Sequence, residues 1–465
     1  MSHMLEEPLG PGGIAGYARR LRSGETTARH TVACYLDRIA KLNPLLNAYV
    51  HVSGESALQA ASAVDSMLAS GTDLGPLMGV PVAIKDLIKV NGMPTRLGSE
   101  ADVEDLAGEE GFFVKELRRA GCILLGKTHT VEFAVGSAGT NYRLGTPRNP
   151  FDRTQFRVPG GSSSGSAVAV AAGMCALAVG TDTGGSVRGP AAFCGVFGLK
   201  FGRDSFPTEG MFSMSKSFDS LGLMASTAGS VATSWECLTG QRIPKIDVSA
   251  LRLGKPDSYF FDDLSPDVST LISLALDKLQ AAGARIHEIE IPALHDTDAL
   301  YTSIARPEVL ATLGTDRFVE IRPQLNPDVA ARIATGLGAS AEQYLLSQRR
   351  RESLRRDVNE TFTSLDAWVA PVKRFLPPPF PGPFPKPDAE AAMERECYGP
   401  TRPANLFDLC GSSQPIAQLG ARLPIGLQLM RPAGDEARLL GIALACESVL
   451  GTGNMPDMSV WLGAL

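Results

Sequence analysis

The stretch from Gly160 to Lys200 constrains the fold more than any other part of this 465-residue chain. It reads as a glycine-rich turn, a helix of small residues, an apolar strand, a second glycine-rich turn, a helix and a strand. Apolar strands that alternate with helices are typical of sheets buried on both faces. The stretch therefore predicts an α/β fold with a layered sheet.

The rest of the chain completes a single predicted domain over residues 5–465. Residues 5–70 carry apolar positions at helical spacing and predict an N-terminal helical segment. Residues 71–239 form the core, and residues 240–361 are predicted to be a largely helical insertion or cap with one strand at ARIHEIEIP. Residues 362–465 return to the core and include a proline-rich, aromatic loop at 375–388.

Composition and charge exclude several classes of protein. A net charge of −6, spread along the chain, argues against a nucleic-acid or membrane surface. No apolar run reaches the roughly 18 residues of a membrane span, and no signal peptide opens the chain. The eight cysteines have no CxxC spacing and form no cluster with histidines, which favours free thiols and no metal. We expect a cytoplasmic protein.

One motif suggests a nucleotide site that its context rejects. The segment GCILLGKT, Gly121 to Thr128, satisfies the phosphate-loop pattern. A phosphate loop needs a flexible run after a strand and before a helix. Here the variable residues are an apolar strand and the helix comes first, so we do not expect nucleotide binding.

The segment GTDTGGSVRGP has the composition of a nucleophile beside an anion-binding turn. We expect Ser186 to open a helix that runs to about Cys194. The backbone N–H groups of Thr183, Gly184, Gly185 and Ser186 could then hold a developing oxyanion. An ordinary glycine-rich turn with a capping serine remains the alternative.

A second run, GGSSSGS at 160–166, could supply a relay between that nucleophile and a base, because a hydroxyl both donates and accepts. No histidine lies in or beside either run, so lysine is the remaining base. Lowering a lysine pKa to near 7 takes about 4–5 kcal/mol and requires burial. Lys85, at the end of the apolar run VPVAI, offers such a site; Lys127 and Lys200 compete with it.

These motifs together resemble the amidase signature family over nearly the whole chain. The tract Gly160 to Ala191 matches throughout, and GPLMGVPVAIKD, AGCILLGKTHTVEFA, FCGVFGLK and LPIGLQLM also resemble family segments. The resemblance implies a mixed sheet layered between helices. It implies Ser186 as acyl-forming nucleophile, Ser162 as relay serine in a cis peptide, and Lys85 as base. The separation of 24 residues favours Ser162 over Ser163 or Ser164.

The resemblance also suggests roles for residues outside this triad. We expect Asp182 and Arg188 to brace the nucleophile turn by pairing, and Lys127 and Lys200 to support structure. In the proline-rich loop, Phe375, Phe380 and Phe384 are candidates for an apolar lip that favours aryl or hydrophobic acyl groups. An uninvolved solvent loop is the alternative.

The function implied is hydrolysis of a small aryl or hydrophobic amide without a cofactor, through an acyl-serine. Hydrolysis of carbamates or esters by the same triad is an alternative. A glutamine-hydrolysing amidotransferase subunit is another, and a non-catalytic binding protein is a third of a different class. We expect a small-molecule substrate, no nucleic-acid or membrane partner, and a chain that could form a homodimer.

Overall fold

The computed structural model describes residues 7–382, 385–398, 400–416 and 422–463. Over these residues the strands form one sheet in the order β1-β3-β2-β4-β6-β5-β10-β11-β9-β7-β8. Their bounds are β1 (Tyr49–Val52), β2 (Pro81–Lys85), β3 (Ile123–Thr128), β4 (Leu177–Thr181), β5 (Phe197–Lys200), β6 (Leu221–Ala225), β7 (Arg252–Pro256), β8 (Arg285–Ile289), β9 (Ala367–Pro371), β10 (Leu409–Pro415) and β11 (Gly426–Pro432). Strand β2 pairs in parallel with β3 and β4, and β7 with β8 and β9, whereas the other pairs are antiparallel. The mixed α/β fold predicted from the sequence is confirmed.

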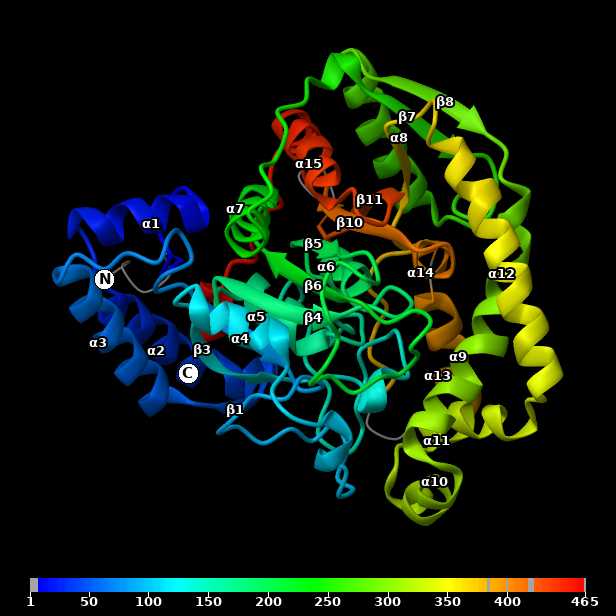
Figure 1. The fold of residues 1–465 in the computed structure, drawn as a ribbon, viewed down its shortest axis with the longest axis horizontal. Coiled ribbons are helices and arrows are strands. Elements are labelled where there is room, and N and C mark those ends of the chain that lie inside the picture. The colour runs from blue at the N-terminus through cyan, green and yellow to red at the C-terminus, as the bar shows by residue number, and fades with distance from the viewer. Residues whose placement is uncertain (1–6, 383–384, 399, 417–421, 464–465) are drawn as a thin grey trace.

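Helices cover both faces and both ends of this sheet. Their bounds are α1 (Gly13–Ser23), α2 (Ala28–Leu46), α3 (Gly54–Ala69), α4 (Phe112–Arg119), α5 (Ser164–Ala171), α6 (Arg188–Phe193), α7 (Ala228–Thr239), α8 (Pro266–Ala281), α9 (Thr297–Leu313), α10 (Thr315–Ile321), α11 (Pro327–Ala334), α12 (Ala341–Thr361), α13 (Pro387–Cys397), α14 (Arg402–Leu406), α15 (Glu436–Leu450) and α16 (Ser459–Leu462). Helices α1 to α3 lie near the β1 end of the sheet, α8 packs on β8 at the other end, and α9 to α12 lie on the side of the molecule opposite α1 to α3 (Figure 1).

The two central helices follow the two serine-containing turns. Helix α5 packs on β2, β3, β4 and β6, while α6 packs on β5, β10 and β11, and the two helices contact each other. The residues of α5 are all small or β-branched and all buried, so the helix can approach the sheet closely. Helices α7, α15 and α8 also pack on this sheet. One of their contacts joins the Trp235 ring of α7 to the Phe201 ring. This packing holds both serine turns at one edge of a rigid core.

The segment 240–361 differs from the predicted helical insertion, because it also extends the sheet. It supplies β7 in addition to the expected strand β8, and β7 joins the sheet through β9. The sequence of β7, RLGKP, contains a glycine and a proline and no β-branched residue, so it carries no strand signal. Strand β1 was missed in the N-terminal segment because it is only four residues long and lies between helices.

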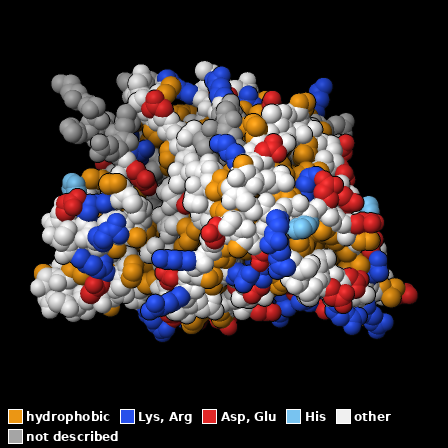
Figure 2. Space-filling view, turned by 90° about the horizontal axis from the view of Figure 1, so that it is seen from above, with side chains coloured by type: hydrophobic (Ala, Val, Ile, Leu, Met, Phe, Trp, Pro, Cys, Tyr) orange, Lys and Arg blue, Asp and Glu red, His pale blue; other side chains and the backbone are white. Residues whose placement is uncertain are grey.

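Other features of the sequence have simple counterparts in the structure. Strand β3 follows α4, so GCILLGKT is a helix-to-strand connection and a buried strand. All eight cysteines are free thiols. Among the described helices, none is both long and apolar enough to cross a membrane. On the face seen in Figure 2, acidic and basic side chains are interspersed with apolar ones.

Candidate active site

Lys85 is the last residue of β2, a strand whose five residues are all buried between β3 and β4. Its side chain is fully buried, and its Nζ donates to Ser162 Oγ at 2.8 Å and to Thr181 Oγ1 at 2.7 Å. Burial lowers the pKa of Lys85 to about 7, although the carboxylates of Asp182 and Asp219 act in the opposite direction. A substantial fraction of this amine is therefore neutral at pH 7 and able to accept a proton.

Ser162 lies in the turn before α5. The peptide bond between Gly161 and Ser162 is cis. The Ser163 N–H donates to the Ser186 carbonyl at 3.1 Å, and the Gly161 N–H donates to the Ser137 carbonyl at 2.8 Å. The two serine turns, distant in sequence, are thus joined by a backbone hydrogen bond.

The Ser186 turn is organised by the carboxylate of Asp182. That carboxylate accepts from the N–H groups of Gly185 at 2.8 Å and Val187 at 3.0 Å. Helix α6 begins at Arg188, with Val187 at the N-cap position, so Ser186 lies in the turn before the helix and not at its first residue as predicted. The Gly185 N–H is already bonded to a carboxylate, so we remove it from the predicted oxyanion donors.

The other three predicted donors are available. The N–H groups of Thr183, Gly184 and Ser186 have no acceptor among the described residues. The loop is narrow here: a Cβ on Gly185, whose φ is +119°, would lie 2.0 Å from Thr401 Oγ1. Thr401 in turn donates its hydroxyl to the Gly184 carbonyl at 2.7 Å. A side chain at Gly185 would therefore displace the loop that carries these donors.

Asp182 and Arg188 form a fully buried pair, with Arg188 Nη2 2.9 Å from Asp182 Oδ1. Arg188 also donates to the Thr401 carbonyl at 2.8 Å and to Asn405 Oδ1 at 2.7 Å. Burial raises the pKa of the Asp182 carboxyl, but Arg188 and further cationic and amide partners outweigh it and leave the pKa well below its usual range. The pair links the nucleophile turn to the segment that enters α14.

Asp219 supports the turn from its other side, and no sequence motif marks it. It accepts from Thr183 Oγ1 at 2.6 Å and from Ser213 Oγ at 2.9 Å. Burial raises the pKa of its carboxyl to about 6. Thr183 is therefore held by its side chain, while its N–H has no acceptor among the described residues.

The two competing lysines serve other places. Lys127 Nζ lies 3.0 Å from Asp86 Oδ1 and donates to Thr95 Oγ1 at 2.8 Å. Lys200 Nζ donates to the carbonyls of Phe201 and Leu409 at 2.8 and 2.9 Å. Both lysines are thus committed to groups outside the two serine turns, whereas Lys85 is joined to them.

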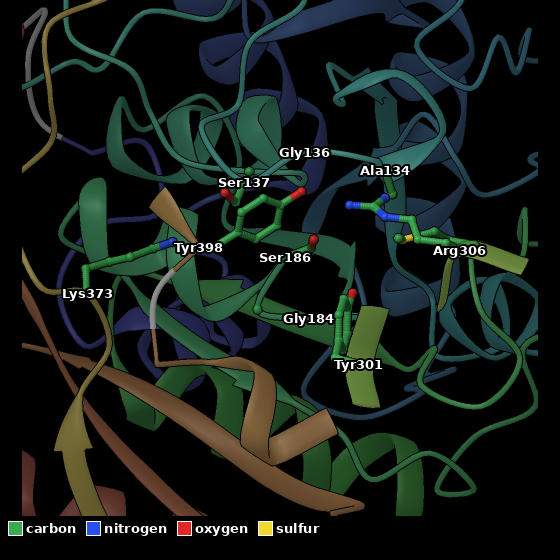
Figure 3. Close-up of a pocket in the computed structure, with 12 residues that line it drawn as sticks. Ala134, Gly136, Ser137, Gly184, Ser186, Tyr301, Arg306, Lys373 and Tyr398 are labelled. Carbon is green, nitrogen blue, oxygen red and sulfur yellow. The ribbon is translucent and has the colours of Figure 1, made fainter. Parts of the chain in front are cut away.

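A narrow cavity lies at the two serine turns, and Ser186 forms part of its lining. Backbone and small residues of the two turns form one part of its wall. The rest comes from side chains that the sequence did not single out: Ser137, Met214, Tyr301, Arg306, Lys373 and Tyr398. Figure 3 shows the Ser186 hydroxyl between Arg306 and Tyr301 on one side and Lys373 and Tyr398 on the other.

The predicted aromatic lip is not part of this cavity. Neither Phe375 nor Phe380 lines it. Phe380 instead packs on the Phe156 ring at 4.4 Å and the Tyr142 ring at 5.9 Å between centroids. Phe384 lies outside the described residues. The aromatic wall belongs to Tyr301 and Tyr398, which no motif marks because they come from a helix and a turn outside the serine-containing tract.

Lys85 is thus bonded to Ser162, and the turn of Ser162 is joined to that of Ser186, which lines the cavity. Comparisons with known proteins agree with this arrangement. The model of the family described as Amidase matches residues 30–440. The chain belongs to the amidase family. This amidase is 36% identical over 451 residues to 2-amino-5-chloromuconic acid deaminase of Comamonas testosteroni, covering 95% of this chain and 96% of the relative. It is 35% identical to one chain of the glutamyl-tRNA(Gln) amidotransferase of Chromohalobacter salexigens, covering 92% and 94% of the two chains.

Solved structures agree with this assignment. The crystal structure of another amidase superposes with a TM-score of 0.86 at 31% identity, covering 94% of this amidase and all of that chain. Native peptide amidase from Stenotrophomonas maltophilia gives a TM-score of 0.79 at 27% identity, covering 97% and 99%. This amidase is accordingly a hydrolase of C–N amide bonds. In the described part of the chain, no group of three or more histidine, cysteine or acidic side chains is placed to hold a metal ion.

Proposed function

We propose that this amidase cleaves a carboxylic amide through an acyl-Ser186 intermediate, with Ser162 as relay and Lys85 as base. The observation that carries the proposal is the hydrogen bond of 2.8 Å between the buried Lys85 amine and Ser162 Oγ, next to the turn whose Ser186 lines a cavity. Neutral Lys85 takes the proton of Ser162 as Ser162 takes that of Ser186. Ser186 Oγ bonds to the carbonyl carbon, and the oxyanion rests on free backbone N–H groups.

The remaining steps return the enzyme to its starting state. The C–N bond breaks as the proton passes back along the same relay to the leaving nitrogen. Water then attacks the Ser186 ester, its proton going to the relay, and the acid leaves while Ser186 regains its hydroxyl. Oxyanion stabilisation falls to the N–H groups of Thr183, Gly184 and Ser186, because Asp182 occupies that of Gly185.

We further propose that the substrate is a small molecule with an aryl or otherwise flat or hydrophobic portion, in the cytoplasm. The side chains of Met214, Tyr301 and Tyr398 support this, since they form the apolar part of the wall. The test measures release of 4-nitroaniline from an acyl 4-nitroanilide and of 4-nitrophenol from a matching 4-nitrophenyl carbamate, by the unmodified enzyme and by Ser186→Ala. Cleavage by the unmodified enzyme but not by Ser186→Ala supports the proposal. The ratio of the nitroanilide rate to the carbamate rate shows whether the enzyme prefers amides or carbamates. Equal rates for Ser186→Ala would overturn it.

Hydrolysis of glutamine for a partner enzyme is the second candidate. It is favoured by the 35% identity to a chain of a glutamyl-tRNA(Gln) amidotransferase. Ammonia released from glutamine, and not from simple amides, would support this candidate over the first. The same measurement on the isolated chain and on a complex recovered with it would show whether a partner is required.

A further inference from the structure

Arg306 is a charged residue in the wall of the Ser186 cavity that has no counter-ion among the described residues. It lies on α9, is 9% exposed and lines the cavity together with Ser186. In Figure 3 its guanidinium points toward the Ser186 hydroxyl. Its Nη1 is buried without a hydrogen-bond partner, and no carboxylate in the described part of the chain lies within 4.0 Å of it. An unpaired buried cation is costly, so this position favours an anion from outside the chain.

The other arginines near the cavity differ because the protein neutralises them. Arg332 lies 3.0 Å from Asp328 and 3.6 Å from Glu394. Arg402 lies 2.7 Å from Asp298 and stacks on the rings of the cavity tyrosines. If Arg306 served only to stabilise the fold, we would expect a carboxylate beside it, as beside Arg332 and Arg402.

The nearest acid in sequence is also committed elsewhere. Glu308, two positions further along α9, faces another direction, since residues two apart on a helix do not share a face. Its carboxylate accepts from Ser215, Ser217 and Tyr344. No carboxylate of the described residues therefore competes with a ligand of the cavity for the Arg306 guanidinium.

The second basic side chain of the cavity carries the same sign when protonated. Lys373 lines the side opposite Arg306 and donates one hydrogen bond to the Cys397 carbonyl. Burial lowers the pKa of Lys373, but even the neutral amine has two N–H donors, so a donor remains for a ligand in either protonation state. The described lining contains no acidic side chain. A lining with two basic groups and, in its described residues, no acid disfavours a cationic substrate and favours an anionic one.

From these observations we propose that the substrate is a short amide that carries a carboxylate, and that Arg306 binds this carboxylate while Ser186 attacks the amide. The proposal rests on the proposed function, which it narrows to one substrate class. A guanidinium is suited to this role because its parallel N–H groups match the two oxygens of a carboxylate.

The test compares charged and neutral amides of similar size. Succinamate is paired with butyramide, where the carboxylate is on the acyl side, and N-acetylglycine with N-propylacetamide, where it is on the amine side. Products are measured as ammonia or amine released, for the unmodified enzyme, Arg306→Gln, Arg306→Lys and the control Arg350→Gln. Arg350 carries the same charge on α12 but is exposed and paired with Asp296 at 2.7 Å.

We expect a preference for the charged member of at least one pair in kcat/KM. Arg306→Gln should reduce that preference by roughly 10- to 100-fold, the range for a hydrogen bond to a charged group. Arg306→Lys should restore part of it, and Arg350→Gln should leave it within about twofold. Loss of activity on both members of a pair alike, with the preference unchanged, would overturn the proposal.

A binding measurement separates this proposal from the proposed function. Calorimetry on Ser186→Ala and on Ser186→Ala combined with Arg306→Gln reports affinity without turnover. If the unmodified enzyme cleaves none of the four amides but Ser186→Ala binds a charged member more tightly and the double variant does not, the carboxylate site stands and the hydrolytic proposal fails for these amides. If neutral amides are cleaved and neither charged member is preferred or bound, the carboxylate site fails and the hydrolytic proposal stands.

Discussion

In the proposed mechanism the pH dependence of the reaction is set by Lys85, whose amine must be neutral to accept a proton. With a pKa of about 7, half of Lys85 is neutral at pH 7. At pH 6 only about a tenth of it is neutral, so kcat/KM should fall about tenfold per pH unit on the acid side. Because protonated Lys85 cannot accept a proton, activity should be present above the pKa of Lys85 and lost below it.

Thr181→Val is the perturbation that tests this assignment. Thr181 Oγ1 accepts from Lys85 Nζ at 2.7 Å, and valine removes this acceptor at nearly constant volume. A hydrogen bond to a charged group contributes about 1.5–3 kcal/mol, part of which the neutral amine retains. The pKa of Lys85 should therefore fall by about one unit, since one unit corresponds to about 1.4 kcal/mol. The acid limb moves to near pH 6, with a modestly lower plateau because the base is weaker.

The assay is kcat/KM from pH 5 to 9 on any amide that the unmodified enzyme cleaves. Ser166→Ala is the matched control: its buried hydroxyl bonds to Thr128 Oγ1 at 2.7 Å and to the Val179 carbonyl at 3.2 Å, and neither bond involves the Lys85 amine. Its acid limb should not move. An unmoved limb in Thr181→Val, or a flat profile for the unmodified enzyme below pH 7, would refute Lys85 as the base. If Asp219→Asn removes the fall in kcat/KM on the acid side, that fall is due to Asp219, whose pKa is about 6.

Three further changes test the supporting structure. Lys85→Met should abolish activity yet raise the free energy of unfolding at pH 7 by about 1–3 kcal/mol in a urea titration. Because the pKa of Lys85 is lower in the folded protein than in the unfolded chain, the stability of the unmodified enzyme should rise with pH between about 7 and 10.5. The variant should not show this rise. Asp182→Asn leaves Arg188 buried without its counter-ion and should lower the free energy of unfolding by about 3–5 kcal/mol; an unchanged midpoint would refute the bracing role. Phe380→Ala should lower the melting temperature through lost packing on Phe156 but keep KM within about twofold, whereas a large rise in KM would restore the aromatic lip.

Local sequence limited the candidate reacting groups of this amidase to a few serines and lysines, and the resemblance to the amidase family chose Ser162 and Lys85 among them. Glycine-rich turns and the small-residue helices that follow them can be predicted from the sequence, because both depend on contacts between residues close together in the chain. The apolar run that buries Lys85 is equally local, and burial is the main cause of its lowered pKa. The order of helix and strand at GCILLGKT was enough to reject a phosphate loop.

Only the tertiary structure decided which groups are free and which are occupied. Asp182 withdraws the Gly185 N–H from the oxyanion site, a contact that glycine composition does not reveal. Tyr301 and Arg306 reach the Ser186 cavity from a helix more than a hundred residues further along the chain. A charge is paired or unpaired according to its neighbours in space, and the sequence contains too many acids to predict which one will lie beside a given arginine. Ser186 could therefore be identified as the candidate nucleophile from the sequence. The position of Arg306 beside it depends on how α9 packs against the rest of the fold, which the sequence does not reveal.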